Sequence, residues 1–205
     1  MTIRFHRHDL PDLQHYRVDS VAIDTETLGL DPHRDRLCVV QISPGDGTAD
    51  VIQIAPGQKQ APNLVSLLGN AAVTKLFHFG RFDLAVLYNA FGVMPEPVFC
   101  TKIASRLTRT YTDRHGLKDI TAELLGVVLS KVQQSSDWGA DTLTPEQLEY
   151  AASDVLYLHR LRDVLGVRLA RENRSVEADA CFRFLPTRAK LDLMGWDEED
   201  IFAHS

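Results

Sequence analysis

The stretch Val21-Ala-Ile-Asp-Thr-Glu-Thr27 joins an apolar run to two acids that are separated by one residue. Successive side chains of a β-strand point to opposite faces of the sheet, so a strand here would project Asp24 and Glu26 from the same face. The same Asp-x-Glu spacing recurs at Asp197 and Glu199, in a charged segment that we interpret as a solvated tail. The pair alone therefore identifies no site, and its meaning depends on which residues join it.

Two further segments supply groups that can join this pair. Asp83 follows an apolar run, Lys75-Leu-Phe-His-Phe79, that we predict to be another strand. Tyr150 and Asp154 are four residues apart in a helical stretch, so they share one helix face, one turn apart. Four clustered carboxylates repel one another unless cations neutralise them, and hard divalent cations prefer oxygen ligands. Two such ions about 3.5–4 Å apart suit in-line attack on a phosphodiester, which is the chemistry that this pattern predicts.

The composition is that of a single globular domain. At 205 residues, with 44% hydrophobic and 24% charged residues, the chain can bury one α/β core and is short for two domains. A net charge of −6 argues against dependence on nonspecific attraction to long nucleic acids. The three cysteines are far apart, the N-terminus lacks a signal-like apolar stretch, and no apolar run approaches membrane-spanning length. We therefore predict a cytoplasmic protein without disulfides or membrane association.

Strands followed by interleaved helices predict an α/β domain with a mixed central sheet. We expect strands at 18–24, 36–43, 48–54, 74–79 and 98–100, and helices from about 63, at 81–91, 101–107 and 115–125, and from 145 onward. Thr144, Pro145 and Gln147 form the pattern of a capping box with proline in the first turn, so the last helix is the best defined. Asn63 is expected to cap the short helix, and glycines at 92 and 126 to end two others. We place the core at about 16–170 and a charged extension, expected to make oligomer contacts, at 171–205.

Five residues resemble, in their order along the chain, the motifs of the DEDD superfamily of 3′–5′ exonucleases with a tyrosine in the third motif: Asp24, Glu26, Asp83, Tyr150 and Asp154. The resemblance implies a ribonuclease H-like domain, similar to that of ribonuclease D, with two divalent ions, Mg²⁺ or Mn²⁺. It implies that Asp24, Glu26 and Asp154 hold one ion. Asp24 would bridge to the second ion, which Asp83 would serve. Tyr150 would orient the attacking water, since a phenol with an ordinary pKa near 10 is a poor base at neutral pH.

Residues near these motifs are predicted substrate contacts, and most have a structural alternative. The predicted contacts are Thr25, Leu28, Leu30, His78, Arg81 and Lys131. Leu28 and Leu30 either supply an apolar wedge between two bases, with Leu30 favoured, or pack in the loop after the strand. His78 either contacts phosphate or is a buried histidine. Arg81 either balances the acids or is a solvated arginine, and Lys131 is a predicted phosphate contact.

The chain departs from the family pattern in two places. Phe79 stands where many relatives have asparagine, which leaves one hydrogen-bonding role unfilled. Gly139-Ala-Asp-Thr-Leu143 replaces the Arg-Pro-Leu that many relatives carry before the third motif, which argues against tRNA processing in the manner of ribonuclease D. Trp138 is expected in the core rather than as a base-stacking platform. Lys102, Arg106 and Arg109 have helical spacing and form either a phosphate-guiding face or a solvated one.

Nearly the whole chain resembles the nanoRNase C family of compact alphaproteobacterial diribonucleotidases. The segments that carry this likeness are 101–116, 133–138 and 200–205. The resemblance implies a ring-like homo-octamer that cleaves 5′-phosphorylated dinucleotides, including linear pGpG, to nucleoside 5′-monophosphates. One alternative is a general 3′–5′ exonuclease that acts on longer RNA or DNA. The other is a non-catalytic nucleic-acid-binding protein, against which the presence of all four carboxylates argues.

Overall fold

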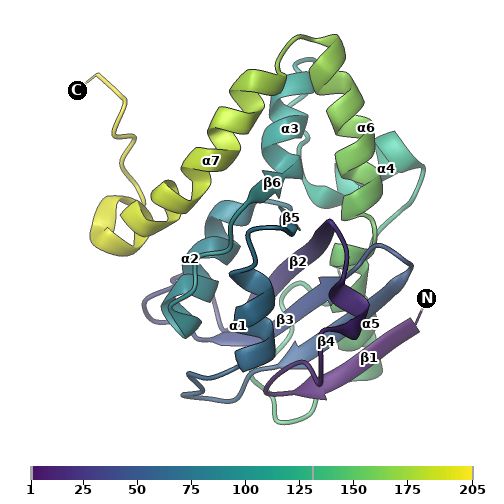
Figure 1. Cartoon of the computed structure of the whole chain (residues 1–205), viewed down its shortest axis with the longest axis vertical. Helices are drawn as coiled ribbons and strands as arrows, with labels where there is room; N and C mark the ends of the chain where they lie inside the picture. The colour runs from purple at the N-terminus through teal and green to yellow at the C-terminus, as the bar shows by residue number, and fades with distance from the viewer. Residues whose placement is uncertain (1, 131, 205) are drawn as a thin grey trace.

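Six strands form the centre of the structure, a computed structural model that describes residues 2–130 and 132–204 (Figure 1). The sheet has the order β1-β4-β3-β2-β5-β6. Its strands are β1 (Thr2–Arg7), β2 (Ser20–Thr27), β3 (Leu37–Ser43), β4 (Thr48–Gln53), β5 (Thr74–Phe77) and β6 (Val98–Cys100). Strand β3 is antiparallel to β2 and β4, while the other neighbouring pairs are parallel. The predicted mixed sheet is confirmed, and β2, which carries the paired acids, lies in its interior.

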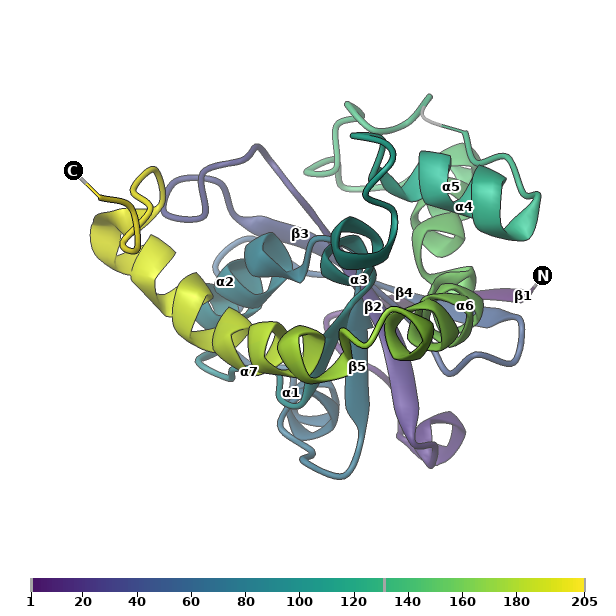
Figure 2. The same cartoon turned by 90° about the horizontal axis from the view of Figure 1, so that it is seen from above.

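Helices pack around this sheet, as the two views in Figures 1 and 2 show. They are α1 (Pro62–Leu68), α2 (Gly80–Phe91), α3 (Thr101–Thr108), α4 (Leu117–Leu125), α5 (Pro145–Leu156), α6 (Leu158–Arg171) and α7 (Ser175–Leu191). Helix α5 packs against β1 to β4, while α2 contacts β2, β3 and β5 and α7 lies along α2 and β6. Across the described residues, no helix combines the length and apolar character needed to cross a membrane.

The local signals in the sequence place most element boundaries well. Strands β3, β4 and β6 and helix α3 lie within one residue of their expected bounds. The capping box at α5 is present, because Thr144 Oγ1 accepts from the Gln147 amide and Gln147 Oε1 accepts from the Thr144 amide, at 3.2 and 2.9 Å. Gly92 and Gly126 end α2 and α4 in the left-handed region, with φ of 71° and 68°. These features are set by short-range contacts, which is why the sequence predicts them.

Two local expectations were wrong. Helix α1 begins at Pro62 with Ala61 as its N-cap, so Asn63 does not cap it. Instead the Asn63 side-chain amide donates to the carbonyl of Leu10 at 2.8 Å and ties the helix to the N-terminal segment. The late helix is not continuous, because it breaks at Tyr157 into α5 and α6. This break lets α5 cover the sheet while α6 packs against α3.

The hydrophobic core extends beyond the expected range of 16–170. Strand β1 pairs in parallel with β4 and so adds an edge strand to the sheet. Helix α7, in the segment expected to be a charged extension, buries Phe182 and Leu185 in the same hydrophobic cluster as the sheet. The ring of Phe182 lies 4.6 Å from that of Phe99 on β6, measured between centroids. The segment after α6 is therefore part of the packed fold up to the end of α7.

A buried carboxylate attaches β1 to the sheet. Asp50, on β4, is only 2% exposed and accepts two hydrogen bonds from Arg4, at 2.8 and 2.7 Å, one from Tyr16, and one from His6 at 2.7 Å. Burial raises the pKa of Asp50, but the hydrogen bonds from Arg4, Tyr16 and His6 outweigh this and hold it below its usual value. The charge of Asp50 therefore stabilises the docking of β1.

We predict that Asp50→Asn lowers the free energy of unfolding at pH 7 by about 2–3 kcal/mol. Removing one partner of a fully buried ion pair costs roughly 3–5 kcal/mol. The expected loss is smaller here because the Arg4 side chain keeps 27% of its surface exposed. A group with a lowered folded pKa stabilises above its unfolded pKa, so the difference should narrow below about pH 4. Urea unfolding at pH 7 and below pH 4 measures the free energy of unfolding, with Asp113→Asn, which removes an exposed carboxylate, as the control. An equal loss of stability in the two variants would contradict the role of Asp50 in docking β1.

Candidate active site

Three acids from two elements converge beside the centre of the sheet. Carboxylate oxygens of Asp24, Glu26 and Asp154 all lie within 4.8 Å of one another. Asp24 and Glu26 project from one face of β2, and α5 packs on that strand and brings Asp154. Oxygen-only ligand sets of this kind suit a hard divalent cation such as Mg²⁺ or Mn²⁺. The donor set therefore fits the predicted metal chemistry.

Asp83 reaches the same region from a different element. It lies in the first turn of α2, is 3% exposed, and accepts a hydrogen bond from Thr25 Oγ1 at 2.7 Å. Thr25 lies between Asp24 and Glu26 on β2, so its side chain points to the opposite face of the strand. Asp83 is not one of the three acids whose oxygens lie within 4.8 Å of one another, but it lines the same pocket. Thr25 orients Asp83 and also lines this pocket, so its contact with substrate stays a prediction.

The pKa values of all four carboxylates lie above their ordinary values. Burial is the largest cause for each of them. For Asp24 the charges of Asp83, Asp154 and Glu26 add to burial, and its pKa lies well above the ordinary value. The pKa of Glu26 rises to about 9, and those of Asp83 and Asp154 to about 7. Without a cation the site thus holds charge at the expense of fold stability.

Tyr150 lies one turn before Asp154 on α5 and lines the same pocket. Burial, followed by the charges of Asp154, Glu26 and Asp24, raises its pKa far above the ordinary value. Its ring packs at 6.0 Å from that of Trp138, which is 3% exposed and belongs to the core as predicted. A phenol held protonated in this way can donate a hydrogen bond to a water molecule but cannot act as a base at neutral pH.

Gln41 is a site residue that the sequence analysis missed. It faces Asp24 across the β2–β3 pair, is fully buried, and donates from Nε2 to Asp24 Oδ2 at 2.7 Å. Its hydrogen bonding also opposes the rise in the pKa of Glu26. Gln41 Oε1 is buried and has no hydrogen-bond partner among the described residues, so the contact of Nε2 with the carboxylate accounts for the orientation of this amide. A single polar residue in the otherwise apolar run Leu37–Ile42 was the signal that could have identified it.

A pocket of about 640 Å³ opens in front of the acids. Leu28 and Leu30 lie on its wall with 55% and 85% of their surfaces exposed, so they remain available as an apolar wedge. His78 also lines it, with Nδ1 2.9 Å from Thr101 Oγ1. Burial, and then the charge of Lys102, lowers the pKa of His78 to about 3. His78 is therefore neutral near pH 7.

Several predicted phosphate contacts lie elsewhere or are bound by other residues. Arg81 makes two hydrogen bonds to Asp192, at 2.6 and 2.8 Å, and does not line the pocket. Lys131 lies outside the described residues. Lys102, Arg106 and Arg109 do not form one face, because α3 ends at Thr108 and the side chain beyond it turns inward. Arg109 is 1% exposed and pairs with Glu123, whereas Lys102 alone of the three lines the pocket.

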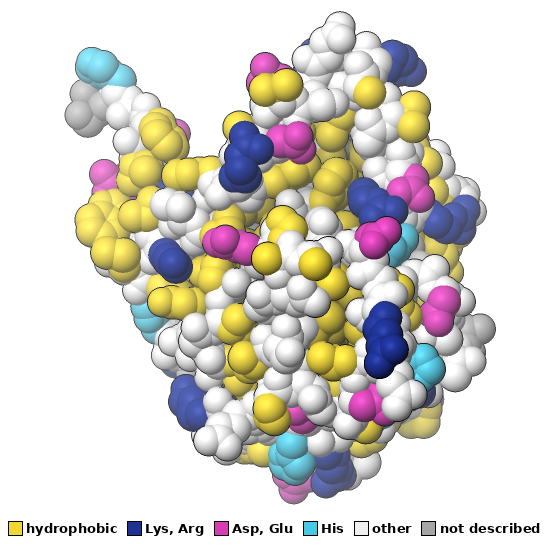
Figure 3. Space-filling model, viewed as in Figure 1, with side chains coloured by type: hydrophobic (Ala, Val, Ile, Leu, Met, Phe, Trp, Pro, Cys, Tyr) yellow, Lys and Arg dark blue, Asp and Glu magenta, His cyan; other side chains and the backbone are white. Residues whose placement is uncertain are grey.

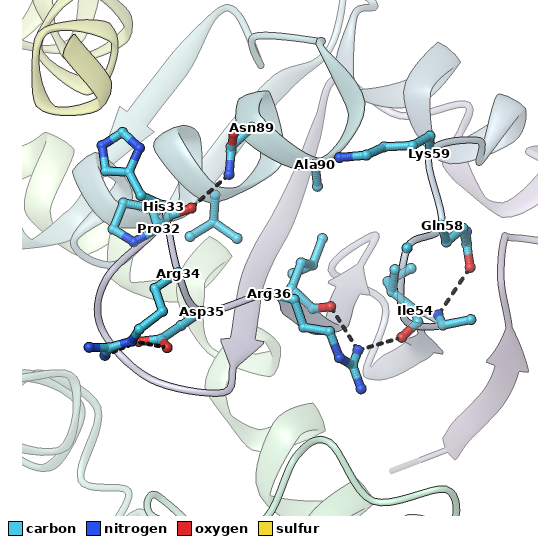
Figure 4. Close-up of a pocket in the computed structure, with 14 residues that line it drawn as sticks. Pro32, His33, Arg34, Asp35, Arg36, Ile54, Gln58, Lys59, Asn89 and Ala90 are labelled. Atoms are coloured by element: carbon cyan, nitrogen blue, oxygen red, sulfur yellow. Dashed lines mark hydrogen bonds and ion pairs between the residues drawn. The ribbon is translucent and has the colours of Figure 1, made fainter.

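A second, smaller pocket lies near the end of α2 and is drawn in Figure 4. It has about 190 Å³ and is lined mainly by the loops at 32–37 and 54–59. Its polar groups bind one another: Arg34 pairs with Asp35, and Arg36 donates to the carbonyls of Leu37 and Ile54. No cluster of catalytic groups converges there. The acidic pocket is therefore the candidate active site.

A model of the 3′–5′ exonuclease family matches residues 12–170. The chain belongs to this family. NrnC (nanoRNase C) of Brucella melitensis, in a structure with bound Mg²⁺, is 74% identical and aligns over 100% of both chains with a TM-score of 0.97. A structure of that nuclease bound to pGG aligns equally completely, with 75% identity and a TM-score of 0.98. The predicted resemblance to nanoRNase C is thus confirmed.

Ribonuclease D is a more distant member of the 3′–5′ exonuclease family. The Acidiphilium cryptum enzyme is 36% identical over 154 residues, which cover 75% of this chain and 39% of the relative. The Escherichia coli RNase D structure is 28% identical, with a TM-score of 0.77, over 86% of this chain and 46% of that one. The chain thus spans about two fifths of the length of its curated relatives, and the likeness concerns the exonuclease fold.

The raised pKa values predict how the metal-free protein responds to pH. A carboxyl whose folded pKa is raised destabilises the fold as pH rises above its unfolded value near 4, because the folded state binds more protons. In EDTA, the free energy of unfolding of the wild type should fall from about pH 4 toward pH 9. At pH 8, Asp24→Asn should melt at least about 3 °C above wild type, which corresponds to roughly 1 kcal/mol in the free energy of unfolding. The difference should vanish near pH 4.

Thermal melts in EDTA measure this effect, with Glu149→Gln, an exposed acid on α5, as the charge-matched control. Glu149 precedes Tyr150 on α5 and does not line the pocket. A wild type that is as stable as Asp24→Asn at pH 8 would show that the acids do not strain the fold.

Proposed function

We propose that the protein is a metal-dependent 3′–5′ exoribonuclease that hydrolyses short RNA, preferentially 5′-phosphorylated dinucleotides such as linear pGpG, to nucleoside 5′-monophosphates. The convergence of Asp24, Glu26 and Asp154 beside Tyr150 in one pocket carries this proposal. The nuclease that is 74% identical over its full length supports the substrate class, since its solved structures hold Mg²⁺ and pGG.

In this proposal the acids hold the metal and the phenol holds the water. Asp24, Glu26 and Asp154 would hold one divalent ion, Mg²⁺ or Mn²⁺, and Asp24 and Asp83 would serve a second. Bound ions of this kind activate a water molecule and stabilise the leaving 3′ oxygen. Tyr150 orients the attacking water through its protonated hydroxyl.

The size and charge of the pocket support a short substrate. Its volume of about 640 Å³ lies within the range of roughly 300–1,000 Å³ that is usual for small-molecule sites. The net charge of −6 argues against dependence on nonspecific attraction to a long polyanion, and on the face in Figure 3 Lys and Arg are interspersed with Asp and Glu. Leu28 and Leu30 are suited to separate two bases. A general exonuclease on longer RNA or DNA is the alternative that the ribonuclease D relatives favour.

We further propose that the protein assembles into a homo-octamer. The C-terminal segment after α7 lies at the left of Figure 1. It exposes four large apolar side chains: Met194, Trp196, Ile201 and Phe202. Exposed aromatic and methionine side chains are typical of subunit contacts. Light scattering of the full chain and of a chain truncated after Leu193 tests this, and a monomer for the full chain would contradict it.

Tyr150→Phe tests the water-orienting role of the hydroxyl. The substitution keeps the ring that packs on Trp138, so the fold and substrate binding should be preserved. Turnover should fall by about 10²-fold, the size of a lost acid–base or positioning contribution. Steady-state kinetics in Mg²⁺ measure the change, with Tyr111→Phe as a control outside the pocket. An unchanged kcat would make Tyr150 a packing residue only.

An assay of 5′-labelled RNAs two to ten nucleotides long tests the substrate class. Dinucleotides should be cleaved at least tenfold faster than a seven-nucleotide RNA, which corresponds to about 1.4 kcal/mol in transition-state binding. EDTA should abolish cleavage of every length. Equal rates for short and long RNA would instead favour the general exonuclease, and full activity in EDTA would overturn the metal mechanism.

A further inference from the structure

Phe79 has an unusual backbone conformation at the edge of the acidic pocket. It is the N-cap of α2, with φ of 67° and ψ of 40°, in the left-handed region. This region is a genuine outlier for a bulky residue and costs free energy that a glycine would avoid. Non-glycine residues held in such conformations cluster at ligand-binding sites.

The surrounding turn explains the backbone but not the aromatic side chain. The chain must turn sharply from β5 into α2 to place Asp83 in the first turn of the helix. At Gly80 a Cβ would lie 2.8 Å from Phe77 Cβ, so this neighbour must be glycine. Nothing comparable requires a ring at Phe79, which is 45% exposed and lines the pocket rather than the core. The fold therefore tolerates strain for a side chain that it does not bury.

Lys102 completes this part of the pocket wall. It reaches from α3, with Nζ 4.2 Å from the centroid of the Phe79 ring, and also lines the pocket. A cation over one face of an aromatic ring is attracted by its quadrupole and stays near it. The wall thus presents an exposed aromatic ring together with a positive charge. Nucleotides have the matching chemistry, a flat base attached through its sugar to a phosphate.

We propose that Phe79 is a base-stacking platform for the substrate, and that Lys102, held against its ring, contacts the adjacent phosphate. The inference rests on the proposed nuclease function and adds a base-binding residue to it. Stacking is tolerant of base identity, because every base has a π-face.

Phe79→Gly separates this role from a structural one. Glycine relaxes the backbone, so the variant should melt at or above the wild-type temperature, while KM for a 5′-phosphorylated dinucleotide rises at least tenfold and kcat changes less than threefold. Phe79→Trp should retain a KM within about threefold of wild type. Phe5→Ala, which removes a 40% exposed ring outside the pocket, is the matched control and should leave KM unchanged. A lower melting temperature with unchanged KM would overturn the proposal.

Dinucleotides that lack one base identify the stacked position. The tenfold loss in kcat/KM of Phe79→Gly should disappear on either the 5′- or the 3′-abasic dinucleotide, because wild type then has nothing to stack at that position. If Phe79→Gly shows the full tenfold loss in kcat/KM on both abasic dinucleotides, the stacking role of Phe79 is overturned. Wild-type turnover of the intact dinucleotide tests the proposed function separately. If wild type cleaves only longer RNA, the test uses an RNA that lacks its 3′-terminal base and the intact RNA of the same length. The ratio of kcat/KM between wild type and Phe79→Gly should then be at least tenfold on the intact RNA and close to one on the abasic RNA.

Discussion

The crowding of four carboxylates in one pocket is the constraint on which this structure depends. Burial raises the pKa values of Asp24, Glu26, Asp83 and Asp154, and neighbouring charges add to this for the first three, so a fold that brings the acids close loses stability until a cation compensates. The protein meets this cost with an interior strand. β2 lies between β3 and β5. Asp24 and Glu26 pair with Gln41 and Val39 of β3, and this ladder fixes the spacing of the paired acids although they repel.

The two faces of β2 carry different residues of the site. Asp24 and Glu26 face α5, whereas Thr25 points the other way and holds Asp83 of α2 by a hydrogen bond of 2.7 Å. Gln41, from the adjacent strand, donates to Asp24 without adding charge. A neutral donor is the suitable partner here, because a lysine or arginine in its place would compete with a divalent ion for the same oxygens. Positioning and charge neutralisation are thus assigned to different groups.

The part of the site that could be predicted from the sequence is the part encoded over a few residues. Alternation in β2, the four-residue spacing of Tyr150 and Asp154 and the capping box at Thr144 are local, and all appear as expected. Strand β1 was missed because its decisive partner, Asp50, lies 46 residues from Arg4. Arg109 was assigned to a surface because its helical spacing gave no sign that α3 ends one residue earlier and that Glu123 binds it. Tertiary partners decide such positions, and no local pattern reports them.

The position of Arg81 is also decided by a tertiary partner, and it links the site to the C-terminal segment. Instead of facing the acids, its guanidinium binds Asp192, which also accepts from Arg188 at 2.8 Å. Asp192 is 7% exposed, so two arginines neutralise one buried charge. Arg81 stands two residues before Asp83 in the first turn of α2, the turn that also follows the strained Phe79. The helix start that orients an active-site acid is therefore held in place by Asp192, at the start of the C-terminal segment whose apolar side chains are exposed.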